Sequence, residues 1–455
     1  MKKSKFVFAQ GFYTNLSESD IENISFDNIG RLICRRTNKN LTISSAVYTT
    51  MCSNTTPRIV VMILISVTLS SSSLSPVILI PGNAGNQLEA RLDKPSNPSS
   101  TCPTKTCSWY RLYLDLWQLR KDKIGCWSEN MKLLYNKAAG TCSNVEGVFT
   151  RVPGWGDTSS MDYLDPSWSA WAAGDAGNYL HDMVEFLVKQ GYTRGSNLRG
   201  APYDFRFAPH SQGTFFQMLK LLIEESFLSN NETPVTIISH SMGGLFAIHF
   251  FHQQSQAWLD QHVHHFITLN TPWTGVVLQL NTYASGYNMD ISLIDPLVIR
   301  ESQRSFETSI YLLPLPTTWP DKTKVLVSTP AKNYTVQDYP AFFKDIGFPE
   351  GWDMMLDILN LTPLRHPRVR TSCMYSLGVD TPVGFVYGAG FPDKQPRKIL
   401  GDGDGTVSRE SAEACRNFLT GAEDSVIVVK STNHGDILKH QDVFSFIASN
   451  IYIDK

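Results

Sequence analysis

The sequence predicts an α/β fold with a mostly parallel β-sheet. Short apolar segments alternate along the chain with segments of helical periodicity, which is the pattern of strands joined by helical crossovers. In addition, residues 236–246 have the pattern of a buried strand, a sharp turn at Ser241 and a helix. A helix that packs closely behind the preceding strand leaves room only for small side chains at the turn. The neighbouring small residues are Ser239, Gly243 and Gly244.

The composition is that of a folded protein with balanced charge. The chain has 455 residues and a net charge of −2. This length allows one large domain with insertions or two to three domains. The charge balance gives no indication of nucleic-acid binding. The eight cysteines include no CxxC pair, so we expect no zinc ribbon and no thioredoxin-type site.

The first 75 residues differ from the rest of the chain. Residues 1–50 are polar, and we assign them no function. An apolar run at 59–69, followed by serines, has the length and flanks of a signal-peptide core, so we predict a signal peptide at 51–75. Translation would then start at Met51 or Met62, or residues 1–50 would be an artefact of the gene model; a signal anchor that leaves residues 1–57 in the cytosol is the alternative.

Spaced cysteines and glycosylation sequons favour the secretory pathway, with the lysosome and secretion both open as destinations. The candidate glycosylation sites beyond the signal peptide are Asn231, Asn333 and Asn360.

Residues 76–455 are predicted to form the α/β domain. Residues 76–80 have the pattern of a buried strand that leads into a Gly-rich loop containing Asn83. Helical periodicity covers residues 180–191 and 215–223, and strands are expected at 235–239, 266–270, 373–375 and 426–429, before a last helix at 443–451. Three histidines before residue 266 are interpreted as lying on a solvated turn rather than as metal ligands: His262, His264 and His265.

Three stretches interrupt this alternation. Residues 101–145 hold four cysteines and an apolar, aromatic run that a soluble surface would avoid, so we predict an excursion that contacts membranes; a disulfide-pinned subdomain packed on the core is the alternative. Residues 281–310 are predicted to form a mobile lid, and residues 311–365, rich in proline and aromatic residues, an inserted cap.

Asp204 and Arg206 are expected to pair in a structured turn.

The turn at Ser241 has the pattern of a nucleophile elbow, with Ser239 where glycine is usual. The N–H of Met242 would then point to the position of an oxyanion, and Asn83 is the candidate second donor. The Gly-dense stretch 401–407 offers Asp404 as the acid, and His434 follows the strand at 426–429 as the base. Nucleophile, acid and histidine in this chain order are typical of α/β-hydrolases.

Two alternatives exist for the acid and the base, namely Asp402 and His440. His440 lies at the start of the last helical segment, which is a poorer position for a base than a loop after a strand. The stretch around Asp402 also resembles a calcium-binding loop, but Thr406 and the absence of a closing glutamate do not fit that motif.

From about residue 76 to the C-terminus, the sequence resembles the lecithin–cholesterol acyltransferase family. The resemblance rests on residues 77–94, on Arg-Val-Pro-Gly-Trp-Gly at 151–156, on the turn at 201–204 and on the elbow. Residues 199–209, 345–352 and 401–407 are more similar to the lysosomal phospholipase branch of this family than to the plasma cholesterol-esterifying branch.

The resemblance implies an α/β-hydrolase core with an inserted membrane-binding subdomain, a cap and a lid. It also implies that Ser241, Asp404 and His434 form the catalytic triad, with the N–H groups of Asn83 and Met242 as oxyanion donors. The implied disulfides are Cys102–Cys126 and Cys373–Cys415. Two further cysteines are extra to the family pattern and could pair with each other, namely Cys107 and Cys142.

The implied activity is that of a serine-dependent phospholipase A and O-acyltransferase at a phospholipid membrane surface. Its donor is a glycerophospholipid, and its acceptor is water or a lipid alcohol such as ceramide. The chemistry passes through an acyl-serine and needs no metal or cofactor. A phosphatidylcholine–sterol acyltransferase is the alternative enzyme, and a non-catalytic lipid-binding protein is the alternative of another class.

The sequence departs from the family at two positions. The lysosomal enzyme has aspartate where this chain has Asn83, and an asparagine stays neutral. We therefore predict a weaker loss of activity towards neutral pH than the acid enzyme shows. A family tryptophan is replaced by Tyr113, so lipid docking would rely on Trp109 or Trp117 instead. The candidate lipid-contacting residues are Trp109, Tyr113 and Trp117.

Overall fold

The computed structural model describes residues 72–96, 101–167, 177–288, 294–359, 361 and 364–454, together with four short strands nearer the N-terminus. These strands are β1 (Ile24–Phe26), β2 (Leu32–Cys34), β3 (Leu41–Ile43) and β4 (Val67–Leu69). Residues 1–74 and 452–455 form one compact unit, which also contains β5 (Ser72–Leu74) paired with β21 (Tyr452–Asp454). Most of the expected signal peptide at 51–75 lies outside the described residues. Within the described ranges, no helix is long and apolar enough to span a membrane.

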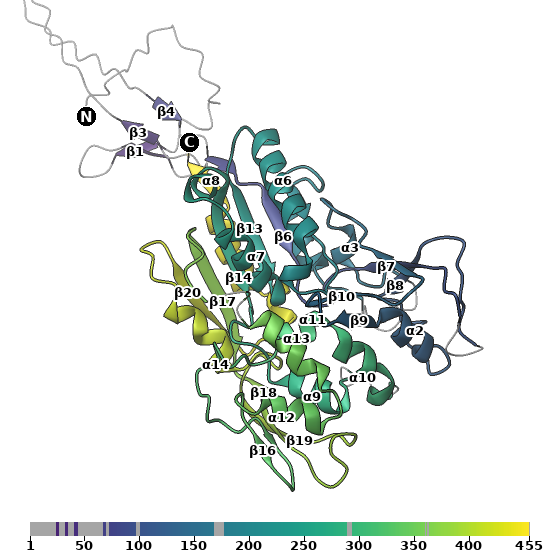
Figure 1. Cartoon of the computed structure of the whole chain (residues 1–455). Helices are drawn as coiled ribbons and strands as arrows, with labels where there is room; N and C mark the ends of the chain where they lie inside the picture. The colour runs from purple at the N-terminus through teal and green to yellow at the C-terminus, as the bar shows by residue number, and fades with distance from the viewer. Residues whose placement is uncertain are drawn as a thin grey trace, which may run out of the picture. The chain divides into compact units, whose positions relative to one another are not determined.

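A six-stranded parallel sheet forms the centre of the second unit, residues 75–451 (Figure 1). Its strand order is β12-β6-β13-β14-β17-β20, and every neighbouring pair is parallel. Strands β6 and β13 consist entirely of buried residues, as expected where helices cover both faces of a sheet. The strands are β6 (Val77–Ile80), β12 (Leu198–Gly200), β13 (Val235–His240), β14 (Val263–Leu269), β17 (Thr371–Leu377) and β20 (Ser425–Lys430).

Helices fill the crossovers that parallel strands require. Helix α6 leads into β13, α7 and α8 connect β13 to β14, and both α6 and α7 pack against β13 (Figure 1). The predicted helices at 180–191, 215–223 and 443–451 are confirmed, with boundaries that differ by a few residues. The helices are α5 (His181–Lys189), α6 (Gly213–Ser229), α7 (Met242–His252), α8 (Gln256–His262) and α15 (Gln441–Asn450).

Strand β14 begins three residues before the predicted start at 266. His264 and His265 therefore lie inside the strand, and the expectation that they flank it on a solvated turn is wrong. His265 is fully buried, and its Nε2 lies 2.8 Å from the hydroxyl of Ser372 on the neighbouring strand. A histidine is tolerated inside the sheet because this neighbour satisfies one of its nitrogens.

The insertion after β6 forms a second, three-stranded sheet of order β11-β7-β8, with two helices and a hairpin. Arg206 is fully buried and ties this region to the core, because it pairs with Asp204 at 2.7 Å and donates to the carbonyl of Met131 at 3.0 Å. The predicted Asp204–Arg206 pair is therefore confirmed. The elements are β7 (Leu88–Leu92), β8 (Tyr110–Tyr113), α2 (Ile124–Met131), β9 (Leu133–Asn136), β10 (Thr141–Asn144), β11 (Val148–Arg151) and α3 (Ser159–Asp162).

The structure contains the disulfides Cys102–Cys126 and Cys373–Cys415. The pairing of Cys107 with Cys142, which the sequence left open, is not present, and both cysteines are free. Cys107 is exposed, whereas the sulfur of Cys142 lies 3.7 Å from the carbonyl oxygen of Ser305.

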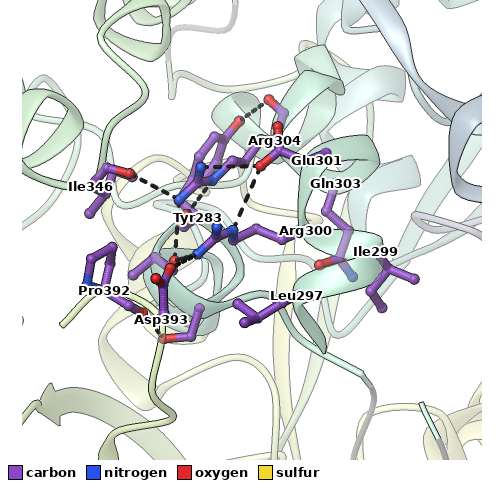
Figure 2. Close-up of polar contacts among 12 residues, drawn as sticks. Tyr283, Leu297, Ile299, Arg300, Glu301, Gln303, Arg304, Ile346, Pro392 and Asp393 are labelled. Carbon is purple, nitrogen blue, oxygen red and sulfur yellow. Dashed lines mark hydrogen bonds and ion pairs between the residues drawn. The ribbon is translucent and has the colours of Figure 1, made fainter. Parts of the chain in front are cut away.

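Residues 278–311 form three helices: α9 (Leu278–Ser285), α10 (Pro296–Ser305) and α11 (Glu307–Tyr311). Two arginines of α10 hold the C-terminal end of α9 (Figure 2). Arg300 donates to Asp393 at 2.5 Å and to the carbonyl of Ala284 at 3.0 Å. Arg304 donates to three backbone carbonyls at 2.6–3.2 Å, those of Tyr283, Ala284 and Ile346. The last carbonyls of a helix lack partners within it, so these arginines satisfy the end of α9. The predicted movement of a lid at 281–310 stays a prediction.

The remaining elements form a four-stranded sheet of order β16-β15-β18-β19 and several short helices. Residues 401–403, expected in a loop, belong to β19, and Asp404 follows this strand directly. The strands are β15 (Val327–Ser328), β16 (Asn333–Tyr334), β18 (Val379–Val386) and β19 (Arg397–Gly403). The helices are η1 (Pro209–Ser211), α12 (Tyr339–Asp345), α13 (Glu350–Ile358), α14 (Arg409–Ala412), η2 (Glu413–Asn417) and η3 (Asp436–Lys439).

Candidate active site

Ser241 lies between β13 and α7 in a strained turn at the carboxyl end of the central sheet. Its backbone has φ 52° and ψ −129°, a left-handed conformation that is uncommon for a residue with a side chain. The neighbouring Gly243 has no room for a side chain, since a Cβ there would lie 2.5 Å from the carbonyl oxygen of Pro81. Together with the parallel sheet, this strand, turn and helix form an α/β-hydrolase core.

The structure brings Ser241, His434 and Asp404 together in one hydrogen-bonded chain. Nε2 of His434 lies 2.9 Å from the Oγ of Ser241, and its Nδ1 lies 2.7 Å from an oxygen of Asp404. Asp404 is 2% exposed, and its other oxygen accepts the backbone N–H groups of Thr406 and Val407 at 2.9 and 2.6 Å. A carboxylate beside Nδ1 holds the proton on that nitrogen, so Nε2 is free to accept the proton of the serine hydroxyl.

The two alternative residues have other partners. Asp402 pairs with Arg409 and accepts the N–H of Gly378 at 2.6 Å, and these contacts lower the pKa of its carboxyl group. His440 caps the N-terminus of α15, where its Nδ1 accepts the N–H of Asp442 at 3.2 Å. Neither side chain belongs to the chain of contacts at Ser241.

The loop of residues 82–85 lies against Ser241. A Cβ on Gly82 would lie 2.8 Å from the Cβ of Ser241, so only glycine allows this approach. The N–H groups of Asn83 and Met242 have no acceptor among the described residues. Two backbone N–H groups, one next to Ser241 in sequence and one in the loop packed against it, are therefore available to bind an oxyanion.

Sequence reasoning gave no role to three residues that hold the backbone of this site. The carbonyl oxygen of His434 lies 3.0 Å from Nε2 of His240 and accepts the side-chain amide of Asn270 at 3.1 Å. Nδ1 of His240 lies 2.7 Å from the hydroxyl of Tyr179. His240 and Asn270 could have been noticed as polar residues at the carboxyl ends of two buried strands, where ligands bind in open α/β sheets. No pattern in the sequence points to Tyr179.

The three expected lipid-contacting aromatic residues lie in different surroundings. Trp117 is 54% exposed and lies beneath the cations of Arg120 and Lys123. Trp109 is half-buried. Tyr113 is buried and packs edge-on against Phe205, so its assignment as a surface residue is wrong. The apolar run alone does not distinguish an aromatic ring that faces solvent from one that faces the core.

The candidate glycosylation sites Asn231 and Asn333 are exposed. Asn360 lies outside the described residues.

Comparisons with known proteins show similarity over most of the chain. The family model for lecithin:cholesterol acyltransferase matches residues 109–362 and 359–450. Lysosomal phospholipase A and acyltransferase of Homo sapiens is 41% identical over 392 residues, which cover 86% of this chain and 93% of that protein. The Bos taurus protein of the same name is 43% identical over 380 residues, covering 83% and 91%. Phosphatidylcholine-sterol acyltransferase of Mus musculus is 40% identical over 349 residues, covering 76% and 77%. The chain therefore belongs to the lecithin:cholesterol acyltransferase family.

Proposed function

We propose that this protein is a serine-dependent phospholipase A and O-acyltransferase that moves a fatty acyl group from a glycerophospholipid to water or to a lipid alcohol. The observation that carries the proposal is the contact of Ser241 Oγ with His434 Nε2 at 2.9 Å, continued to Asp404 at 2.7 Å. The names of the relatives support the choice of a phospholipid as the donor.

In the first half of the reaction, Ser241 Oγ attacks the ester carbonyl carbon, and its proton moves to Nε2 of His434. The carbonyl oxygen becomes an oxyanion that accepts the N–H groups of Asn83 and Met242. The ester C–O bond then breaks, and His434 returns its proton to the departing oxygen. Lysophospholipid leaves with a free hydroxyl group, and the acyl group stays on Ser241.

In the second half, an acceptor hydroxyl attacks the acyl-serine while His434 removes its proton. The bond between the acyl carbon and Ser241 Oγ breaks, and the same proton restores the serine hydroxyl. Water as the acceptor gives a free fatty acid, and a lipid alcohol gives an acylated lipid. The buried Asp404 stabilises the imidazolium that forms in each half.

Trp117 supports docking at a membrane surface, because an exposed indole near two cations suits the interface of anionic and zwitterionic lipids. The names of the relatives support a lysosomal location.

The proposal is tested by product analysis on phosphatidylcholine liposomes that contain ceramide, with and without sterol, at pH 4.5 and 7.4. We expect free fatty acid and acylceramide, and we expect Ser241→Ala to abolish both, by about 10⁶-fold in kcat, while liposome binding is retained. Sterol ester as the main product would instead favour the activity that the mouse relative's name states. Liposome binding without any product, and without labelling of Ser241 by a fluorophosphonate, would leave only a lipid-binding role.

A further inference from the structure

We propose that Tyr179 and His240 are positioning residues that couple the loop of residues 82–85, which carries the N–H of Asn83, to the backbone of His434. The proposal rests on the proposed function, in which Asn83 holds the oxyanion and His434 moves the proton. According to the proposal, the same hydrogen bonds position the N–H of Asn83 and the backbone of His434, which are far apart in the sequence.

The support is a continuous chain of hydrogen bonds. The hydroxyl oxygen of Tyr179 accepts the N–H of Gly82 at 2.8 Å, and the same hydroxyl lies 2.7 Å from Nδ1 of His240. Nε2 of His240 lies 3.0 Å from the carbonyl oxygen of His434. A carbonyl oxygen only accepts, so Nε2 carries the proton and the unprotonated Nδ1 accepts from the hydroxyl of Tyr179. All three donors point in the same direction, so each bond polarises the next.

This order of donors requires a neutral His240. If the ring were protonated, Nδ1 would also donate, and the oxygen of Tyr179 would face two donors, Nδ1 and the N–H of Gly82. His240 is 4% exposed. Burial, followed by the charge of the nearby His434, lowers the pKa of His240 to about 3. The chain of bonds therefore keeps one arrangement at lysosomal and at neutral pH.

The carbonyl of His434 is held from a second side as well. The side-chain amide of Asn270 donates to it at 3.1 Å, and the side-chain oxygen of Asn270 accepts the N–H of Ser376 at 2.7 Å. The N–H of His434 in turn donates to the backbone carbonyl of Asp404 at 2.8 Å. The position of the His434 backbone is thus fixed by the ends of β13, β14 and β17, whereas its ring is oriented by the carboxylate of Asp404.

Tyr179 is the link between the two halves of the site. Gly82 precedes Asn83, so a shift of the Tyr179 hydroxyl moves the N–H of Asn83 and, through His240, the backbone of His434. Catalysis depends steeply on such positions, and a misplacement of about 1 Å can lower a rate by roughly 100-fold. The effect should appear in the chemical step rather than in substrate binding, because neither Tyr179 nor His240 needs to touch the substrate.

The first test is Tyr179→Phe, which removes the hydroxyl and keeps the ring. The matched control is Tyr192→Phe, because the hydroxyl of Tyr192 is likewise buried and hydrogen-bonded, but it donates to the backbone carbonyl of Ser75, at 2.7 Å, at the amino end of the sheet. Kinetics are measured with a soluble short-chain ester, so that membrane docking does not enter. We expect Tyr179→Phe to lower kcat about 10- to 100-fold, with KM within about twofold of wild type, and Tyr192→Phe to leave kcat unchanged. The melting temperatures of the two variants should be similar.

The second test separates the two nitrogens of His240. His240→Gln places an amide N–H near the position of Nε2 and can keep the bond to His434, whereas His240→Asn places an oxygen near Nδ1 and loses that bond. We expect the glutamine variant to keep a kcat about tenfold higher than the asparagine variant. His265→Gln is the control for loss of a buried histidine, since His265 bonds Ser372 at the amino end of the sheet.

Wild type and Ser241→Ala are assayed in parallel. An inactive wild type would overturn the proposed function itself. An active wild type with an unchanged kcat in Tyr179→Phe, or with a loss confined to KM, would overturn only the coupling. If Tyr179→Phe fails to fold, the ratio of kcat between His240→Gln and His240→Asn decides, and equal values would refute the proposal.

Discussion

Two regions of the molecule use buried side-chain nitrogens to hold backbone carbonyls, and they differ in charge. At the carboxyl end of the sheet, His240 and Asn270 hold the carbonyl of His434. At the junction of α9 and α10, Arg304 holds three carbonyls, and its neighbour Arg300 holds one of them and Asp393 (Figure 2). Both regions satisfy carbonyl groups that would otherwise be buried without partners.

The chemistry of each region explains this difference. Burial lowers the pKa of His240 to about 3 and that of Arg304 to about 10, so at pH 5–7 the first is neutral and the second is charged. A positive charge beside His434 would disfavour the imidazolium that forms during acyl transfer. No such constraint applies at α9, where a cation also interacts favourably with the negative end of the helix. We infer from the comparison that a neutral donor suits a position next to the proposed base, whereas a donor that only supports structure can be charged.

The largest expected effect is the loss of kcat when the partner of His434 is changed. Asp404→Asn should lower kcat about 10⁴-fold, because the amide no longer holds the proton on Nδ1 of His434. Asp402→Asn, which removes a partner of Arg409 at the surface, should change kcat by no more than about threefold. Hydrolysis of a soluble ester measures both. Equal losses in the two variants would contradict the assignment of the acid.

The next largest effect is a loss of stability when the arginines at the junction of α9 and α10 are changed. Arg304→Met should lower the free energy of unfolding by about 3 kcal/mol, because three carbonyls lose a buried charged donor. Arg300→Met should cost only about 1 kcal/mol, since its partner Asp393 is 61% exposed. Urea denaturation followed by tryptophan fluorescence gives both values. If Arg300→Met lowers the free energy of unfolding more than Arg304→Met does, Arg304 does not make the larger contribution to stability.

A third prediction concerns the cost of keeping histidines neutral. Burial, followed by the charge of Arg370, lowers the pKa of His265 to about 3, below the unfolded value of about 6.5. The unfolded chain therefore binds more protons below pH 6.5, and the contribution of His265 to stability, complete above that pH, is lost progressively as the pH falls towards 3. Between pH 6.5 and 4.5, His265→Gln should lose about 2 kcal/mol less stability than wild type. Parallel denaturation curves at the two pH values measure this difference, and an equal loss in both proteins would contradict it.

The smallest expected effect concerns the loop of residues 82–85, where a charged side chain can be compared with a neutral one. Asn83→Asp introduces a carboxyl group with an ordinary pKa near 4. Above that pH it carries a negative charge near the developing oxyanion, so activity should fall as the pH rises. The ratio of kcat at pH 4.5 to kcat at pH 7.4 should increase about tenfold over wild type. An unchanged ratio would show that residue 83 does not set the pH dependence.

The contact of Ser241, His434 and Asp404 could be predicted from the sequence because these residues follow a fixed chain order and a distinctive turn. The supporting residues could not, because Tyr179 and His240 act on backbone atoms, and any residue type can present a carbonyl. Tyr113 was misplaced because an aromatic run has the same composition in a core and on a membrane-facing surface. The start of β14 was missed because His265 obtains its partner, Ser372, from a strand more than a hundred residues away in sequence.

The long excursion between β14 and β17 has a consequence for how the sheet tolerates a long insertion. Residues 270–370 leave the sheet and return between two strands that pair directly with each other. Most hydrogen bonds of Arg300 and Arg304 join residues within this excursion. The entropy of closing a loop grows only slowly with its length. A change in the length of this segment therefore adds little loop entropy, while the ends of the sheet strands continue to hold Ser241 and His434.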